Sequence, residues 1–127
     1  MDSPEPCKLS RWQLIKQTLD NLDPEAFRQA MAMDPRPVML DVRTAEEWSG
    51  GSFPGAVHLD YLGGEFLDRL EKLDPDRTYL VFCRSGRRSL RVCTLLKNAG
   101  FTKVYNLDGG LNAWHARYET LSASPLT

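Results

Sequence analysis

The sequence predicts an α/β domain with a mainly parallel central sheet and helices on both faces. Two observations support this prediction: short apolar runs of strand length alternate with segments of helical periodicity, and the connections between them are short. The length of 127 residues, with 42% hydrophobic and 26% charged residues, fits one domain with its own core. Such sheets bind ligands beyond the carboxyl ends of their strands, so residues that follow strands are the first candidates for a site.

The first half of the chain contains two helix starts and two strands. Residues 23–25, Asp-Pro-Glu, predict a helix start, because they combine a capping side chain, a proline at the first helical position and an acid in the first turn. The prolines within 34–37 end that helix, and the apolar run 38–42 predicts a buried strand. A capping-box pattern then opens a brief helix over 44–48, and turn signals lead to a second strand over 56–59.

The second half repeats this alternation. Apolar residues share one helical face over 66–73, and a third strand follows over 79–82. We expect a helix over 89–99 that stops at the glycine that follows, since glycine readily takes the left-handed conformation that ends helices. A fourth strand over 104–107 and a last helix over 111–116 complete the predicted domain.

The net charge and the cysteines of the chain indicate which partners and which cellular compartment to expect. Sixteen Lys and Arg against seventeen Asp and Glu give a net charge of −1, which argues against nucleic acid or an anionic membrane as a partner. Cys7, Cys83 and Cys93 are too few and too widely spaced for a disulfide scaffold, and a reducing compartment is the simpler interpretation. No signal peptide is visible, and no apolar run approaches the roughly 20 residues of a membrane span, so we expect a cytoplasmic protein.

The strongest chemical signal follows the third strand. Cys83 ends that strand, and six residues separate it from the predicted helix interior: Arg84, Ser85, Gly86, Arg87, Arg88 and Ser89. Backbone N–H groups in a glycine-containing turn before a helix can form an anion-binding nest, and the helix N-terminus adds partial positive charge. Together with the arginines, these groups favour the thiolate form of Cys83. The alternative is a small buried hydrophobe beside a solvated arginine-rich surface.

The sequence lacks the motifs that accompany other kinds of cysteine chemistry. A cysteine protease or acyltransferase needs a histidine base, and neither His58 nor His115 lies in a recognisable local motif. No Cys-x-x-Cys pair or zinc-ligand spacing occurs, which argues against a thioredoxin-type dithiol enzyme and a zinc site. A thiolate in an anion cradle suits attack on sulfur or phosphorus in an anionic substrate.

Four motifs follow one another along the chain: Asp41-Val42-Arg43, Phe53-Pro54-Gly55-Ala56-Val57-His58-Leu59, Cys83-Arg84-Ser85-Gly86-Arg87-Arg88-Ser89 and Leu107-Asp108-Gly109-Gly110-Leu111-Asn112-Ala113-Trp114. In sequence and in order, these motifs resemble those of single-domain rhodaneses. The resemblance covers residues 19–118, leaving 1–18 as an N-terminal extension and 119–127 as a tail. It implies a rhodanese-like three-layer fold, with a first short strand near 19–22. Within the extension, Ser10 is a candidate cap for a short helix.

The resemblance implies a sulfurtransferase that carries sulfur as a persulfide on Cys83. The loop from Arg84 to Ser89 would then line the pocket for the persulfide and for an anionic donor, such as thiosulfate or a low-molecular-weight persulfide. A thiol, cyanide or a protein would accept the sulfur, without a metal or an organic cofactor. Asp41 and Arg43 would support the site as an ion pair or by holding the loop, and this role fits them better than a direct catalytic part. Ser52 replaces the histidine that this family usually has in that turn, which questions the turn's hydrogen bonding.

Two other functions remain open at this stage. The fold could serve as a binding or regulatory module with a silent Cys83, although such a module needs neither the cysteine nor the arginines. A related phosphatase would need an arginine six positions after the nucleophile to bind the phosphoryl oxygens, and Ser89 stands there. Cys93 fits a packing role on the helix better than that of a resolving thiol, and Trp114 fits the core.

Overall fold

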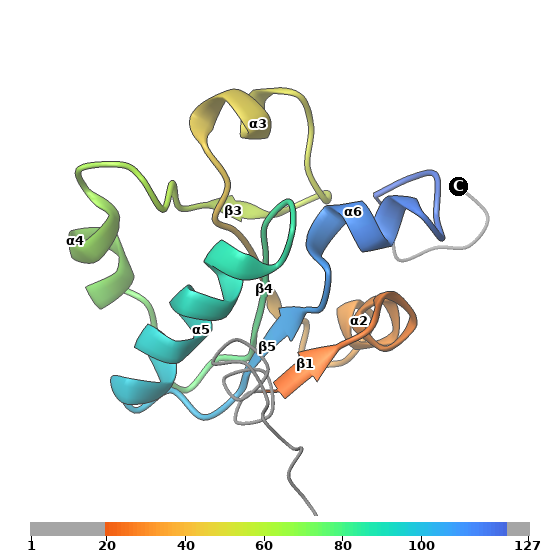
Figure 1. Ribbon diagram of the computed structural model, residues 1–127. Coiled ribbons are helices and arrows are strands. Elements are labelled where there is room, and N and C mark those ends of the chain that lie inside the picture. The colour runs from red at the N-terminus through yellow and green to blue at the C-terminus, as the bar shows by residue number, and fades with distance from the viewer. Residues whose placement is uncertain (1–19, 122–127) are drawn as a thin grey trace, which may run out of the picture.

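The computed structural model describes residues 20–121, which form one parallel five-stranded sheet with helices around it (Figure 1). The strands lie in the order β1-β5-β4-β2-β3. They are β1 (Asp20–Leu22), β2 (Val38–Asp41), β3 (Val57–His58), β4 (Tyr79–Phe82) and β5 (Val104–Leu107). The helices are α2 (Pro24–Met31), α3 (Ala45–Ser49), α4 (Phe66–Glu71), α5 (Arg87–Asn98) and α6 (Gly110–His115). Cys7 and the short helix expected after Ser10 lie outside the described residues.

Two hydrophobic clusters, one on each face of the sheet, confirm the predicted layers. Helices α4 and α5 pack on one face, and α2 and α6 pack on the other. Side chains of β4 alternate between the two clusters, because successive residues of a strand point to opposite faces. Tyr79 and Val81 face α5, whereas Leu80 and Phe82 face α2 and α6. By the same alternation, Cys83 joins the α5 side.

The predicted helix ends are confirmed where a capping side chain or a glycine marks them. The Asp23 carboxylate accepts a hydrogen bond from the Ala26 N–H at 2.8 Å, at the start of α2. Thr44 forms the predicted capping box with Glu47 at the start of α3. Gly100 follows α5 with a φ of +97°, the left-handed stop that the sequence predicts.

Two boundaries differ from the prediction. Helix α5 begins at Arg87 and not at Ser89, because Gly86, at a φ of +92°, turns the chain into the helix without a side-chain cap. The second predicted strand is only two residues long. Its first expected residue, Ala56, donates its N–H to the Phe53 carbonyl at 3.1 Å and so belongs to the preceding turn.

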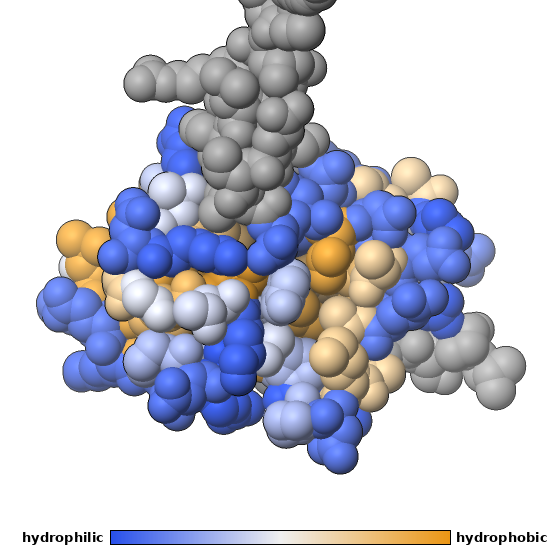
Figure 2. Space-filling model, turned by 90° about the horizontal axis from the view of Figure 1, so that it is seen from below, coloured by the Kyte–Doolittle hydropathy of each residue, from blue (hydrophilic) through white to orange (hydrophobic). Residues whose placement is uncertain are grey.

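A hollow lies between α2 and the neighbouring strands, close to the residues that precede β4 and β5. It is lined mainly by apolar side chains of α2 and the sheet, and Figure 2 shows apolar residues grouped among hydrophilic ones on this lower face. Its lining includes Leu22, Ala30, Met33, Leu80 and Tyr105. Within residues 20–121, no helix is both long and apolar enough to cross a membrane.

Candidate functional site

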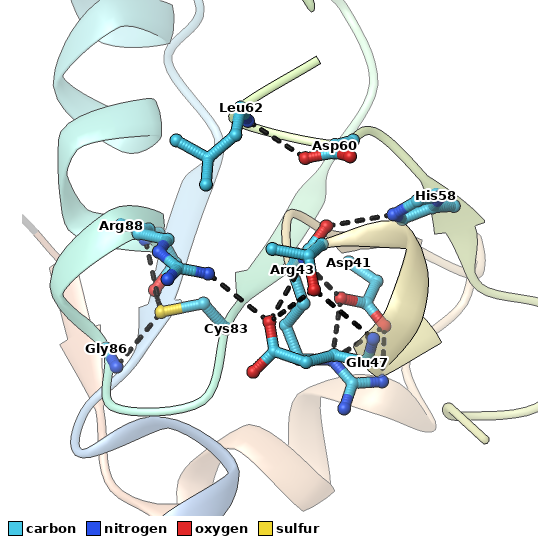
Figure 3. Close-up of polar contacts among 11 residues, drawn as sticks. Asp41, Arg43, Glu47, His58, Asp60, Leu62, Cys83, Gly86 and Arg88 are labelled. Atoms are coloured by element: carbon cyan, nitrogen blue, oxygen red, sulfur yellow. Dashed lines mark hydrogen bonds and ion pairs between the residues drawn. The ribbon is translucent and has the colours of Figure 1, made fainter. Parts of the chain in front are cut away.

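Cys83 lies directly after β4, at the carboxyl edge of the sheet and beside the N-terminus of α5. Its sulfur accepts three hydrogen bonds: from the Gly86 N–H at 3.1 Å, the Ser89 N–H at 3.4 Å and the Ser89 hydroxyl at 3.4 Å. Figure 3 shows the sulfur facing the Gly86 nitrogen. The residue is only 1% exposed, so the sulfur lies at the bottom of a cradle of donors. Such a cradle favours negative charge on the atom that it surrounds.

The turn after Cys83 has its conformation because a glycine stands at position 86. The φ of Gly86 is +92°, which side chains with a Cβ rarely adopt. A Cβ there would also lie 3.1 Å from the Gly109 nitrogen. Glycine therefore allows the chain to curl back, and the N–H groups of Gly86 and Ser89 then point at the sulfur.

The N-terminus of α6 fixes the other side of the same loop. The Leu111 N–H donates to the Cys83 carbonyl and the Asn112 N–H to the Arg84 carbonyl, both at 2.9 Å. A Cβ on Gly110 would lie 2.5 Å from the Arg84 oxygen, so only glycine permits this approach. The loop carbonyls thus face α6. This brace was not predicted from the sequence, although Gly109 and Gly110, two consecutive glycines before a predicted helix, were a visible signal.

The arginines lie at the rim and not against the sulfur. Arg84 and Arg87 are exposed, and Arg88 is half-buried. Arg88 Nη1 lies 3.3 Å from Glu47 Oε1, on α3 (Figure 3). Burial acts to raise the pKa of Glu47, but hydrogen bonds from Thr44 and the nearby Arg88 charge outweigh it, and the pKa is lowered. No local pattern indicates this pair, whose members are 41 positions apart in the sequence.

Asp41, the last residue of β2, forms a buried ion pair with Arg43. Arg43 Nε lies 3.0 Å from Asp41 Oδ1, and Arg43 Nη2 lies 2.8 Å from Asp41 Oδ2. Arg43 Nη2 also donates to the Gly51 carbonyl at 2.7 Å, and the Ser52 hydroxyl donates to Asp41 Oδ2 at 2.8 Å. Ser52 therefore supplies hydrogen bonding in the turn where the serine had put it in question. This network ties β2 to the turn after α3, and hence holds the helix that carries Glu47.

The histidines lie apart from the sulfur's hydrogen bonds. His58 Nε2 is 2.9 Å from the Arg43 carbonyl oxygen, and the ring stacks on Trp48 with centroids 4.8 Å apart. Figure 3 shows His58 pointing toward that carbonyl. His115 is exposed in the last turn of α6. Among residues 20–121, no hydrogen bond joins a histidine to Cys83, so the described site offers no Cys-His pair.

Cys93 and Trp114 lie in the core. Cys93 is 1% exposed among apolar side chains of the α5 face, and its burial raises the pKa of its thiol. Trp114 is fully buried on the opposite face. In the described part of the chain, no group of three or more His, Cys, Asp or Glu side chains is placed to hold a metal ion.

Comparisons with known proteins agree on one family. The model of the rhodanese-like domain family matches residues 23–117. The chain is 39% identical over 89 residues to a putative sulfurtransferase of Bacillus subtilis, YtwF, covering 70% of this chain and 84% of that one. It is 36% identical over 81 residues to the thiosulfate sulfurtransferase GlpE of Pseudomonas savastanoi, covering 64% and 74%. A rhodanese-like domain protein of Staphylococcus aureus superposes with a TM-score of 0.67 at 25% identity, covering 76% and 91%.

Proposed function

This chain belongs to the rhodanese-like domain family, and on that premise we propose that it moves sulfane sulfur from an anionic donor to a thiophilic acceptor through a persulfide on Cys83. The observation that carries the proposal is the set of three donors that point at the Cys83 sulfur from Gly86 and Ser89. The same donors can stabilise a thiolate before transfer and the negative charge of a persulfide after it. The catalytic unit would be residues 19–118.

The reaction proceeds in two displacements. The Cys83 thiolate attacks the outer sulfur of thiosulfate, the S–S bond of the donor breaks, and sulfite leaves with the bonding electrons. Cys83 then carries one additional sulfur, with the negative charge on its terminal atom. An acceptor such as cyanide, a thiol or a protein thiol attacks that terminal sulfur and regenerates the Cys83 thiolate. Alternation of two half-reactions gives ping-pong kinetics.

Charge at the start of α5 supports an anionic donor. The first turn of α5 contains Arg87 and Arg88 and no acidic residue, although the positive end of a helix dipole disfavours cations there. A bound anion relieves this repulsion. Arg84, exposed in the turn before the helix, adds a third positive charge at the mouth of the cradle. These side chains would attract the donor and stabilise the leaving group.

Thiosulfate is the donor to test first, because a relative carries it in its name. The described residues favour no particular acceptor. A reducing compartment such as the cytoplasm would keep the Cys83 thiol free for the reaction.

Turnover with thiosulfate and cyanide tests the proposal. We expect the wild-type protein and Cys93→Ser to form thiocyanate, and Cys83→Ser to form none. Cys93→Ser is the matched control, since it removes the other buried free thiol of the described chain. Absence of sulfur transfer with thiosulfate and with organic persulfides would favour a silent binding module. Hydrolysis of an aryl phosphate in place of sulfur transfer would favour a phosphatase.

A further inference from the structure

The Glu47 carboxylate contacts the cationic rim at Arg88. It comes from α3, 41 positions before its partner, and its Oε1 lies 3.3 Å from Arg88 Nη1 (Figure 3). Arg88 precedes Ser89, whose N–H and hydroxyl both contact the Cys83 sulfur. The negative charge of Glu47 is therefore separated from the proposed donor site only by the Arg88 side chain.

Glu47 is held in place by the start of its own helix. Its Oε1 accepts hydrogen bonds from the Thr44 N–H at 3.1 Å and from the Thr44 hydroxyl at 3.0 Å. The buried pair of Asp41 and Arg43 fixes the strand end from which α3 departs. The carboxylate is consequently positioned independently of Arg88, and it remains beside the site when Arg88 moves.

The contact between Glu47 and Arg88 is weak enough to be exchanged. It is a single contact, longer than the 2.7–2.9 Å typical of charge-assisted hydrogen bonds, and the Arg88 side chain is 38% exposed. Partly exposed pairs of this kind contribute little to stability. An incoming anion can therefore take Arg88 away from Glu47, but it must then lie near a carboxylate that has lost this partner.

We infer that Glu47 selects sulfur donors by charge: it competes for Arg88 and so disfavours dianionic donors relative to donors with one negative charge. The inference rests on the proposed sulfurtransferase function. With either class of donor, the Cys83 thiolate takes the outer sulfur as the donor's S–S bond breaks. Thiosulfate, with two negative charges, releases sulfite, whereas an aromatic thiosulfonate, with one, releases a sulfinate. The repulsion from Glu47 is stronger for the donor with the larger charge.

Glu47→Gln separates this charge effect from the structural role of the side chain. Glutamine retains the carbonyl oxygen that accepts from Thr44, and it is a normal residue at this position of a capping box. Glu46→Gln is the matched control, because it removes the same charge from an exposed position on the same helix. Thermal unfolding of both variants checks that the fold is retained.

The first measurement needs no sulfur transfer. Alkylation of Cys83 by anionic iodoacetate is compared with alkylation by neutral iodoacetamide, on protein that carries both Cys7→Ser and Cys93→Ser and so retains one thiol. Because both reagents react with the thiolate, the ratio of the two rates does not depend on the thiolate fraction. It reports how the charge of the site affects an anionic reagent. We expect Glu47→Gln to raise this ratio about two- to fivefold, the size of a partly exposed ion pair, and Glu46→Gln to change it by less than about 1.5-fold.

The second measurement uses the donors themselves. We expect Glu47→Gln to raise kcat/KM for thiosulfate relative to the thiosulfonate by about two- to fivefold, mainly through a lower KM. Equal effects of Glu46→Gln and Glu47→Gln, or unchanged ratios in Glu47→Gln, would overturn the inference. An undiminished Glu47→Gln effect in an Arg88→Gln background would also overturn it, because Glu47 would then act without Arg88. If wild-type protein transfers no sulfur while the alkylation ratio shifts as expected, the proposed function fails and the charge effect of Glu47 stands.

Discussion

Replacing Gly110 by alanine would test the contact that braces the Cys83 loop. Gly110 has a φ of +61°, and an alanine Cβ would lie 2.5 Å from the Arg84 carbonyl oxygen and 2.6 Å from the Cys83 carbonyl oxygen. Both neighbours are backbone atoms, so no side chain can rotate away to relieve the contact. Either α6 or the loop must move.

Two terms set the expected loss of stability. The left-handed conformation costs an alanine about 1–2 kcal/mol, and overpacking against fixed atoms adds about 1–3 kcal/mol. We therefore expect the free energy of unfolding to fall by roughly 2–5 kcal/mol, measured by urea denaturation at constant m-value. Displacement of the loop by about 1 Å would also misplace the sulfur, and we expect thiosulfate turnover to fall about 100-fold.

Gly55→Ala is the matched control for this experiment. Gly55 also has a positive φ, +76°, but an added Cβ there would meet no atom within 4 Å. Only the conformational term applies, so we expect a loss of about 1–2 kcal/mol and turnover within about twofold of wild type. Equal losses of stability and of turnover in the two variants would refute the proposed brace.

Three further predictions concern the groups around the loop. Asp41→Asn leaves the Arg43 charge buried without its partner and should lower the free energy of unfolding by about 3–5 kcal/mol in urea, whereas Asp20→Asn, at an exposed pair, should lower it by less than about 1 kcal/mol. Because the pKa of Glu47 is lowered in the folded protein, its ionised carboxylate stabilises the fold at pH values above the ordinary pKa of 4.5, and this contribution is lost as the pH falls through the lowered pKa. The Tm difference between wild type and Glu47→Gln should therefore shrink from neutral pH to about pH 3, and a constant difference would contradict this. Ser89→Ala removes one donor to the sulfur and should slow persulfide formation in stopped-flow assays roughly tenfold, with an unchanged rate arguing against that hydrogen bond.

The sequence predicted the fold and the position of Cys83 because both depend on local patterns. Strand β4 is a continuous apolar run, and Cys83 follows it directly, so its place at the edge of the sheet follows from strand direction alone. The start of α5 was placed two residues late. Its N-terminal turn is set by Gly86, and the Ser89 hydroxyl contacts the sulfur and caps no helix.

The remaining parts of the site depend on contacts between distant segments. Glu47 was visible only as part of a capping box, and nothing near it in sequence indicates that it meets Arg88. Likewise, the glycines before α6 indicated a turn, but the close approach of Gly110 to the Arg84 backbone depends on how α6 packs against the loop. Such contacts arise from tertiary packing, which a single sequence does not encode in any local pattern.

The most direct test of sulfur transfer through Cys83 is the mass of the intact protein after incubation with thiosulfate. We predict that the wild-type protein and Cys93→Ser gain one sulfur atom, that cyanide removes it, and that Cys83→Ser gains none. Failure of the wild-type protein to gain sulfur from either thiosulfate or an aromatic thiosulfonate would contradict the account, as would an equal gain by Cys83→Ser.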